Sequence, residues 1–162
     1  MTEPMLILRP SAPRRVFGLL IQLTLGGLLL YLAVVFPPAS AGWRIFLIVL
    51  GVAALVMGQR GWYGSALGIV LDETGLHQED GRPVAPMDNI ASVDRALFSF
   101  KPSNGFIVRL REPMERAWVP GLWWRMGRRV GVGGVTGGAE TKIVADALSL
   151  MVAARDEGRD QS

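Results

Sequence analysis

Residues 109–129 hold the side chains best suited to binding chemistry in this 162-residue chain. The segment contains six arginines against two glutamates, and it holds three of the five tryptophans. An arginine near an anionic membrane surface gains about 1 kcal/mol, and indole rings prefer the interface between lipid and water. The segment therefore predicts a lipid-facing surface. The residues expected to form it are Trp123, Trp124, Arg125, Arg128 and Arg129.

Two other interpretations of this segment stay open. Its tryptophans could fill the core of a strand pair whose arginines lie outside, and a basic, aromatic surface could also bind single-stranded nucleic acid. Residues 59–162 carry 13 basic and 13 acidic side chains, so this part of the chain has no net charge. We therefore expect no nucleic acid among the partners.

The other candidates for catalysis or cofactor binding lack the patterns that such chemistry needs. Residues 131–138 are rich in glycine, but Thr136 stands where a dinucleotide motif needs its third glycine, and Gly138 is not followed by Lys-Ser/Thr, as a phosphate loop requires. They predict a turn into the following helix. With His77 as the single histidine and no cysteine, no usual zinc site can form. We expect no metal, no cofactor, no small-molecule substrate and no catalytic residue.

Two apolar stretches lie before the region of these candidates. Residues 16–36 contain no charged side chain, and as a helix at about 1.5 Å per residue they are about 31 Å long, enough to cross a bilayer. A second run, 45–58, reaches a similar length with its flanks, 43–63. We expect a two-helix transmembrane hairpin. Two alternatives stay open: a signal sequence cleaved after Ala41, and a second helix that enters the membrane only halfway.

The charges beside these stretches predict their orientation. Arg9, Arg14 and Arg15 precede the first stretch and Arg60 follows the second, whereas Arg44 alone lies by the short connection. Cytoplasmic flanks of membrane helices are enriched in Lys and Arg, so we expect both termini in the cytoplasm. The excess of arginine over lysine suggests a bacterial chain, and hence a multi-pass protein of the inner membrane.

Small residues predict how the two helices pack. Gly18, Gln22 and Gly26 share one face of the first helix at four-residue spacing. Lipid supplies no hydrophobic force between helices, so small residues favour their close approach. We expect Gln22 to support this contact through a hydrogen bond rather than to line a transport pathway. The small residues expected on the second helix are Gly51, Ala54 and Gly58.

The remaining residues alternate apolar and polar side chains in short runs, which is typical of strands. Asp72-Glu73-Thr74-Gly75 and Glu79-Asp80-Gly81-Arg82 read as turns whose carboxylates are solvated. Residues 139–155 instead carry apolar side chains at helical spacing, which predicts an amphipathic helix with Leu148 and Met151 in the core. Strands are expected at residues 67–71, from Leu76, and at 90–96, 105–110, 117–120 and 128–134.

The order of these elements resembles bacterial pleckstrin-homology-like (PH-like) domains. In that family a segment of the type P-[W]-x-D-I-x-x-V commonly leads into the third strand. The segment Pro86-Met87-Asp88-Asn89-Ile90-Ala91-Ser92-Val93 is similar, with Met87 where an aromatic residue is frequent. The resemblance covers residues 64–157 and implies a seven-stranded, bent antiparallel barrel with a capping helix and no catalytic activity. Members that bind phosphoinositides use basic residues near the first turn, which is acidic here.

The expected fold is a membrane α-helical hairpin plus an α+β, mainly β domain. Its parts are a basic cytoplasmic segment at 1–15, the hairpin at 16–63, the PH-like domain at 64–157 and a tail at 158–162. We expect a non-enzymatic inner-membrane protein whose domain is a binding or assembly module in contact with anionic lipid headgroups. Its other expected partner is a protein, or a second copy of the chain. The alternative function is an accessory subunit that stabilises a larger membrane complex through the hairpin.

Overall fold

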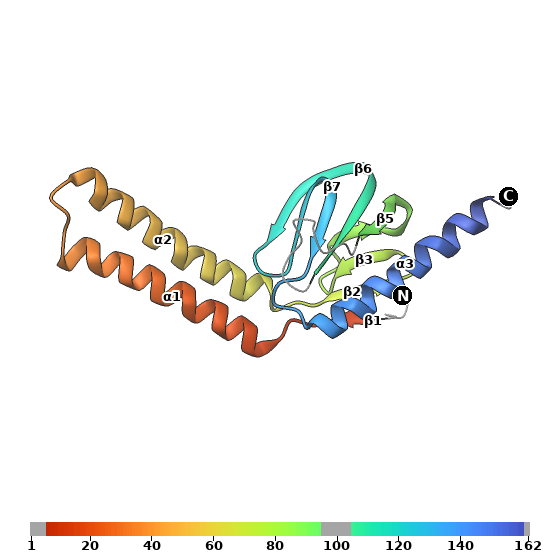
Figure 1. The fold of residues 1–162 in the computed structure, drawn as a ribbon, viewed down its shortest axis with the longest axis horizontal. Coiled ribbons are helices and arrows are strands. Elements are labelled where there is room, and N and C mark those ends of the chain that lie inside the picture. The colour runs from red at the N-terminus through yellow and green to blue at the C-terminus, as the bar shows by residue number, and fades with distance from the viewer. Residues whose placement is uncertain (1–5, 95–104, 161–162) are drawn as a thin grey trace.

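The computed structural model describes residues 6–94 and 105–160, and it consists of two long helices that project from a β domain (Figure 1). Helix α1, Ala12–Val35, and helix α2, Ala41–Gly64, are joined by a short connection and pack against each other. Pro13 lies in the first turn of α1, where a missing N–H costs no helical hydrogen bond. Both helices are long and apolar enough to cross a membrane, so the two expected helices are present.

The described strands form two antiparallel sheets of four and three strands, in the orders β1-β2-β3-β4 and β5-β6-β7. The 3₁₀ helix η1, Met87–Asn89, connects the sheets. The expectation of one bent barrel is therefore wrong, because no ladder joins β4 to β5 in the described part of the chain. Pro83 and Pro86 occupy both ends of β4 and have no N–H to donate to such a ladder. The strand bounds are β1 Leu6–Leu8, β2 Ile69–Asp72, β3 Gly75–Gln78, β4 Pro83–Pro86, β5 Ile90–Asp94, β6 Phe106–Val119 and β7 Trp123–Val132.

Strand β1 comes from the segment that precedes the helices. It pairs with β2 through the register Leu6↔Leu71 and Leu8↔Ile69, and Leu8 is completely buried. The helical hairpin is thus inserted between the first and second strands of one sheet. The expected domain boundary at residue 64 left this strand out, because three residues are too few to show an alternating pattern.

Strands β6 and β7 form one long β-hairpin. The sequence predicted two separate strands at 105–110 and 117–120, but they are the two ends of β6. The register with β7 shifts on both sides of Met114, next to Pro113, whose missing N–H interrupts the ladder. This irregularity is the reason that the sequence pattern of one strand resembles that of two shorter strands.

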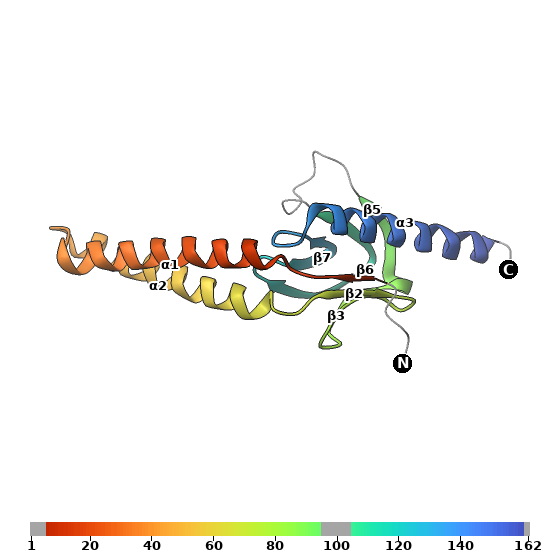
Figure 2. The ribbon, with the colours of Figure 1, turned by 90° about the horizontal axis from the view of Figure 1, so that it is seen from below.

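Helix α3, Gly138–Asp160, covers the other side of the domain from β3 and contacts β5, β1 and β6 (Figure 2). Leu148 is completely buried, as expected, and Met151 is partly buried against the same core. Ile143 lies within the apolar pattern of residues 139–155 but is 56% exposed. Large side chains at the centre of the core include Trp123 and Phe106.

Candidate functional site

The contact between α1 and α2 depends on three glycines that leave no room for a side chain. A Cβ added to Gly26 would lie 2.7 Å from Leu55 Cγ and 2.9 Å from the Gly51 carbonyl oxygen. A Cβ on Gly58 would lie 2.9 Å from Gln22 Cβ. Gly26, Gly51, Ala54 and Gly58 are all buried, so the structure brings together most of the residues expected at this contact.

Gly18 and Gln22 differ from that expectation. Gly18 is exposed, and nothing lies within 4 Å of a Cβ placed on it. Gln22 touches Gly58 through its Cβ, and within the described residues its amide has no hydrogen-bond partner. The contact instead uses Ala33, which is completely buried and was not singled out from the sequence. Ala33 lies seven residues after Gly26, about two helical turns along the same face.

Arg15 links α1 and α2 by hydrogen bonds at the end of the hairpin that meets the domain. Its Nη2 donates to the Trp62 carbonyl oxygen at 2.8 Å, and its Nε donates to Ser65 Oγ at 3.0 Å. The guanidinium also lies 4.6 Å from the centre of the Trp62 ring, within the range of a cation–π contact. We call Arg15, Trp62 and Ser65 the hairpin base.

The end of α2, next to the hairpin base, is held to the domain by contacts with the end of β6, the β6–β7 turn and β3. A Cβ added to Gly64 would lie 2.8 Å from Val119 Cγ1, and one added to Gly61 would lie 3.7 Å from Pro120. Gln78 Nε2 donates to the Gly64 carbonyl oxygen at 3.3 Å. The end of α2 therefore lies directly against two parts of the domain.

The start of α1 is tied to the glycine-rich segment. Arg14 Nη1 donates to the Thr136 carbonyl oxygen at 2.6 Å, and the Ser11 N–H donates to the Val135 carbonyl oxygen at 2.8 Å. Gly134 has φ +95°, and a Cβ there would come within 2.4 Å of the Gly121 carbonyl oxygen. The glycine-rich segment thus joins α1, the β6–β7 turn and α3, in agreement with the turn predicted for it.

Two residues of the predicted lipid-facing surface lie inside the protein. Trp123 is 1% exposed and Arg125 is 7% exposed, so the prediction is wrong for both. They are two positions apart on β7, and alternate side chains of a strand share a face, which here is the inner one. Trp124 between them is partly exposed, and Arg128 and Arg129 are exposed.

Arg125 joins the two sheets from within. Its Nη1 donates to the carbonyl oxygens of Pro83 and Val84 on β4, at 2.8 and 3.1 Å, and its Nε donates to the Glu115 carbonyl oxygen on β6 at 2.8 Å. Burial lowers the pKa of Arg125, while the charge of Glu115 opposes that change. A guanidinium keeps its charge under such a change, and the three carbonyls are the partners that make its burial tolerable.

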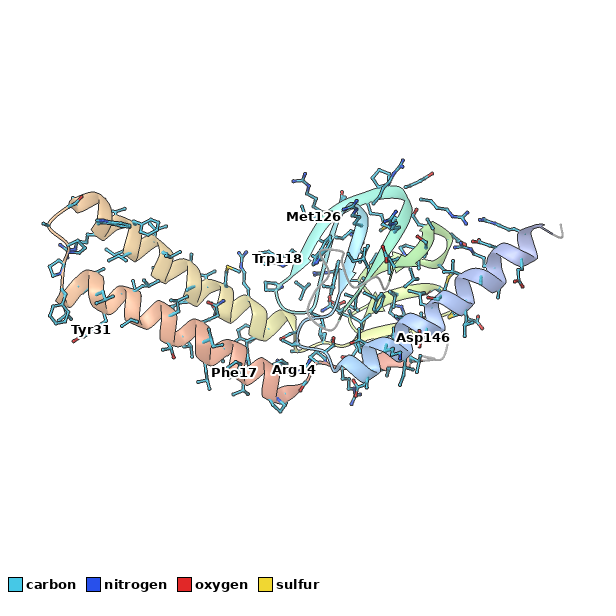
Figure 3. All side chains as sticks on the ribbon, in the orientation of Figure 1. Arg14, Phe17, Tyr31, Trp118, Met126 and Asp146 are labelled. Atoms are coloured by element: carbon cyan, nitrogen blue, oxygen red, sulfur yellow. The ribbon has the colours of Figure 1, made fainter. Side chains whose placement is uncertain are left out.

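The outward side of the β6–β7 hairpin forms an open, mainly apolar groove of about 480 Å³. Trp118 is 60% exposed and Met126 is 58% exposed, and in Figure 3 Trp118 lies at the edge of the domain next to α2. Trp124 lies over Gly131, where a Cβ would come within 2.3 Å of the indole. We call Arg116, Trp118, Trp124 and Met126 the outer face.

A smaller cavity of about 210 Å³ lies at the hairpin base. Its walls come from α1, α2 and the β6–β7 turn, so it lies where the helices leave the domain. Arg15 and Trp62 line one part of it, and Trp118 belongs to both this cavity and the outer face. The other residues that line it include Gly18, Leu19, Gln22, Met57, Gly58, Gly61, Ser65 and Pro120.

The single histidine lies beside the acidic turn at Asp72. Asp72 Oδ1 accepts hydrogen bonds from the Thr74 N–H and hydroxyl, which closes the turn, and His77 Nδ1 lies 3.7 Å from Asp72 Oδ2. Burial raises the pKa of Asp72, but the hydrogen bonds from Thr74 outweigh it and lower the pKa below its usual value. Residues 6–94 and 105–160 contain no group of three side chains arranged as metal ligands.

Comparison with models of known protein families, with curated proteins and with solved structures found no match. Within the described residues, the features that remain for a functional role are the helical hairpin, its base and the outer face.

Proposed function

We propose that this protein is a non-enzymatic component of the bacterial inner membrane, with a cytoplasmic PH-like domain that acts as a binding or assembly module at the bilayer surface. The two apolar helices cross the membrane, and both chain termini lie in the cytoplasm. The domain contacts anionic lipid headgroups through its outer face and presents its remaining surface to a protein partner or to a second copy.

The observation that carries this proposal is the insertion of the helices between β1 and β2. The sheet is continuous on both sides of the insertion, through the pair Leu8↔Ile69. If both helices cross a membrane, residues before α1 and after α2 lie on the same side of it. The domain is thereby attached to the bilayer at two points, and the hydrogen bond from Gln78 to Gly64 holds β3 next to the end of α2.

The strand arrangement supports the PH-like part of the proposal. Four strands form one sheet, three form the other, and a C-terminal helix covers the side they share. Seven is the number of strands that the resemblance implies, although β1 lies outside the range 64–157 and the strands form two sheets instead of one barrel. The acidic turn at Asp72 remains an argument against recognition of phosphoinositides.

The outer face supports the contact with lipid. Trp118 lies beside the end of α2, at the level where α2 would leave the hydrocarbon core, and indole rings favour this depth. Arg116 lies at the same groove, and Arg128 is exposed further along β7. These residues replace the buried Trp123 and Arg125 in the surface that the sequence predicted.

The absence of cysteine allows the proposal to be tested with single cysteine variants of the full chain. Ser40→Cys lies in the connection between the helices, whereas Ile7→Cys and Ser92→Cys lie on exposed positions of β1 and β5. In intact spheroplasts, a maleimide that cannot cross membranes should label the first variant alone, and permeabilised cells should label all three. Labelling of Ser92→Cys in intact spheroplasts would overturn the proposed topology.

The lipid contact can be tested separately in reconstituted vesicles. A polarity-sensitive dye on Met126→Cys should shift to shorter wavelength when phosphatidylglycerol replaces phosphatidylcholine, and salt should reduce the shift because it screens charge over about 8 Å. Leu150→Cys, 71% exposed on α3, is the matched control and should not respond. An equal response at both positions would contradict a contact through the outer face.

A further inference from the structure

The cavity at the hairpin base has polar groups without protein partners, although most of its wall is apolar. Arg15 uses Nε and Nη2 for Ser65 and Trp62, and its Nη1 has no acceptor among the described residues. The side-chain amide of Gln22, which also lines the cavity, likewise has no hydrogen-bond partner among the described residues. Gln22 lies within the apolar stretch, where an amide without a partner is costly, and Arg15 lies at the end of that stretch, where its Nη1 can donate to a headgroup oxygen. Both groups therefore favour a ligand that carries oxygen atoms.

The two groups lie at different depths along α1. Seven residues separate Arg15 from Gln22, which corresponds to about 10 Å and places both side chains on the same side of the helix. Arg15 is at the end of the hairpin that meets the domain, and Gln22 is about two turns further into the apolar stretch. A ligand that fits both must have a charged group at the surface and weaker acceptors further inside.

We propose that this cavity binds one glycerophospholipid, with its phosphate at Arg15 Nη1 and its glycerol ester oxygens towards Gln22. Guanidinium groups donate to phosphate oxygens in charge-assisted hydrogen bonds, and the amide can donate to an ester carbonyl. The volume of about 210 Å³ holds a phosphate and part of the glycerol, while the acyl chains lie along the exposed apolar sides of α1 and α2.

The surroundings favour an anionic headgroup. Arg14 and Arg60 lie close in sequence to the hairpin base, and residues 9–15 contain three arginines and no acidic residue. The indoles of Trp62 and Trp118 line the cavity, and this residue type is enriched at the depth of lipid headgroups. The proposal rests on the proposed function, because it requires that the helices lie in a bilayer.

Gly18 gives a way to block the cavity without changing its polar groups. Nothing lies within 4 Å of a Cβ at Gly18, so the side chain of Gly18→Leu can enter the cavity that Gly18 lines. Gly27 is the matched control, because its Cβ position is equally open and it does not line the cavity. Gln22→Leu removes the deeper polar group and keeps a side chain of similar size.

The experiment is a titration of the purified, delipidated full chain in detergent with phosphatidylglycerol, read by native mass spectrometry as the number of lipids retained. The original chain and Gly27→Leu should each retain one lipid, whereas Gly18→Leu should weaken retention by at least about tenfold and Gln22→Leu by severalfold. Inorganic phosphate at the same concentrations should neither bind nor compete.

Equal retention by Gly18→Leu and Gly27→Leu would overturn the proposal, and so would displacement of the lipid by inorganic phosphate, which would indicate a site for a free anion. The labelling pattern of Ser40→Cys and Ser92→Cys separates this failure from a failure of the proposed function. A correct topology without lipid retention rejects the lipid site alone.

Discussion

Replacing Arg125 by methionine should destabilise the β domain more than the same change at any exposed arginine. Methionine keeps much of the length and the apolar stem, but it cannot donate to the three carbonyls of Pro83, Val84 and Glu115. A hydrogen bond to a charged donor contributes about 1.5 to 3 kcal/mol, and part of the loss is recovered when water reaches the edge strand β4. We therefore expect the free energy of unfolding to fall by about 3 kcal/mol.

This loss can be measured by thermal unfolding of the full chain in detergent. Tryptophan fluorescence can follow this unfolding, because three of the five tryptophans, Trp118, Trp123 and Trp124, lie in the domain. For a domain of about 100 residues, 3 kcal/mol corresponds to a fall in Tm of about 14 °C. Arg128→Met is the control on the same strand, and its exposed side chain should give a change below about 2 °C.

Comparing Arg125→Lys with Arg125→Met separates the contribution of the positive charge from that of the hydrogen-bond geometry. Lysine keeps the positive charge but presents a single ammonium, so it cannot reach carbonyls on both β4 and β6 in the way a guanidinium does. We expect a loss between those of the methionine variant and the control. Equal Tm values for Arg125→Met and Arg128→Met would refute the view that this buried arginine holds the two sheets together.

Two further predictions concern the core and the acidic turn. Leu148→Ala should lower the free energy of unfolding by about 2 to 5 kcal/mol because Leu148 is completely buried. Leu150→Ala, on the exposed side of α3, should lower it little. Similar denaturation midpoints for the two variants would reject the observed orientation of α3. The lowered pKa of Asp72 means that its contribution to stability is present above the unfolded pKa of about 3.9 and is lost as the pH falls through the lower folded value. Asp72→Asn should therefore flatten the pH dependence of Tm in the acid range, and an unchanged slope would show that other carboxylates control acid unfolding.

The sequence could predict the helical hairpin because its signal is local. A length of apolar residues defines each helix, and the spacing of Gly26, Gly51 and Gly58 defines the face on which they meet. The strands and α3 also follow from local alternation and helical periodicity. Their boundaries differ from the expected ones in β6, where Pro113 disturbs the ladder, and in β7, which begins at Trp123 and not at Arg128.

The parts that the sequence could not predict depend on partners far away in the chain. The burial of Arg125 requires acceptors on β4, about forty residues earlier, and a charged residue read locally is placed on the surface. Leu8 enters the core only because β2 lies beside it after sixty intervening residues. The hairpin base likewise joins Arg15 to Trp62, and no local sequence pattern near either residue indicates this contact.

The position of β1 before the helices has a consequence for biogenesis. β1 is synthesised first, yet its hydrogen-bonding partner β2 follows only after both helices have left the ribosome. If one helix failed to enter the membrane, β1 and β2 would be on opposite sides of the bilayer and the sheet could not form. Under the proposed topology, β1 can pair with β2 only when both helices have crossed the membrane, so completion of this sheet depends on correct insertion.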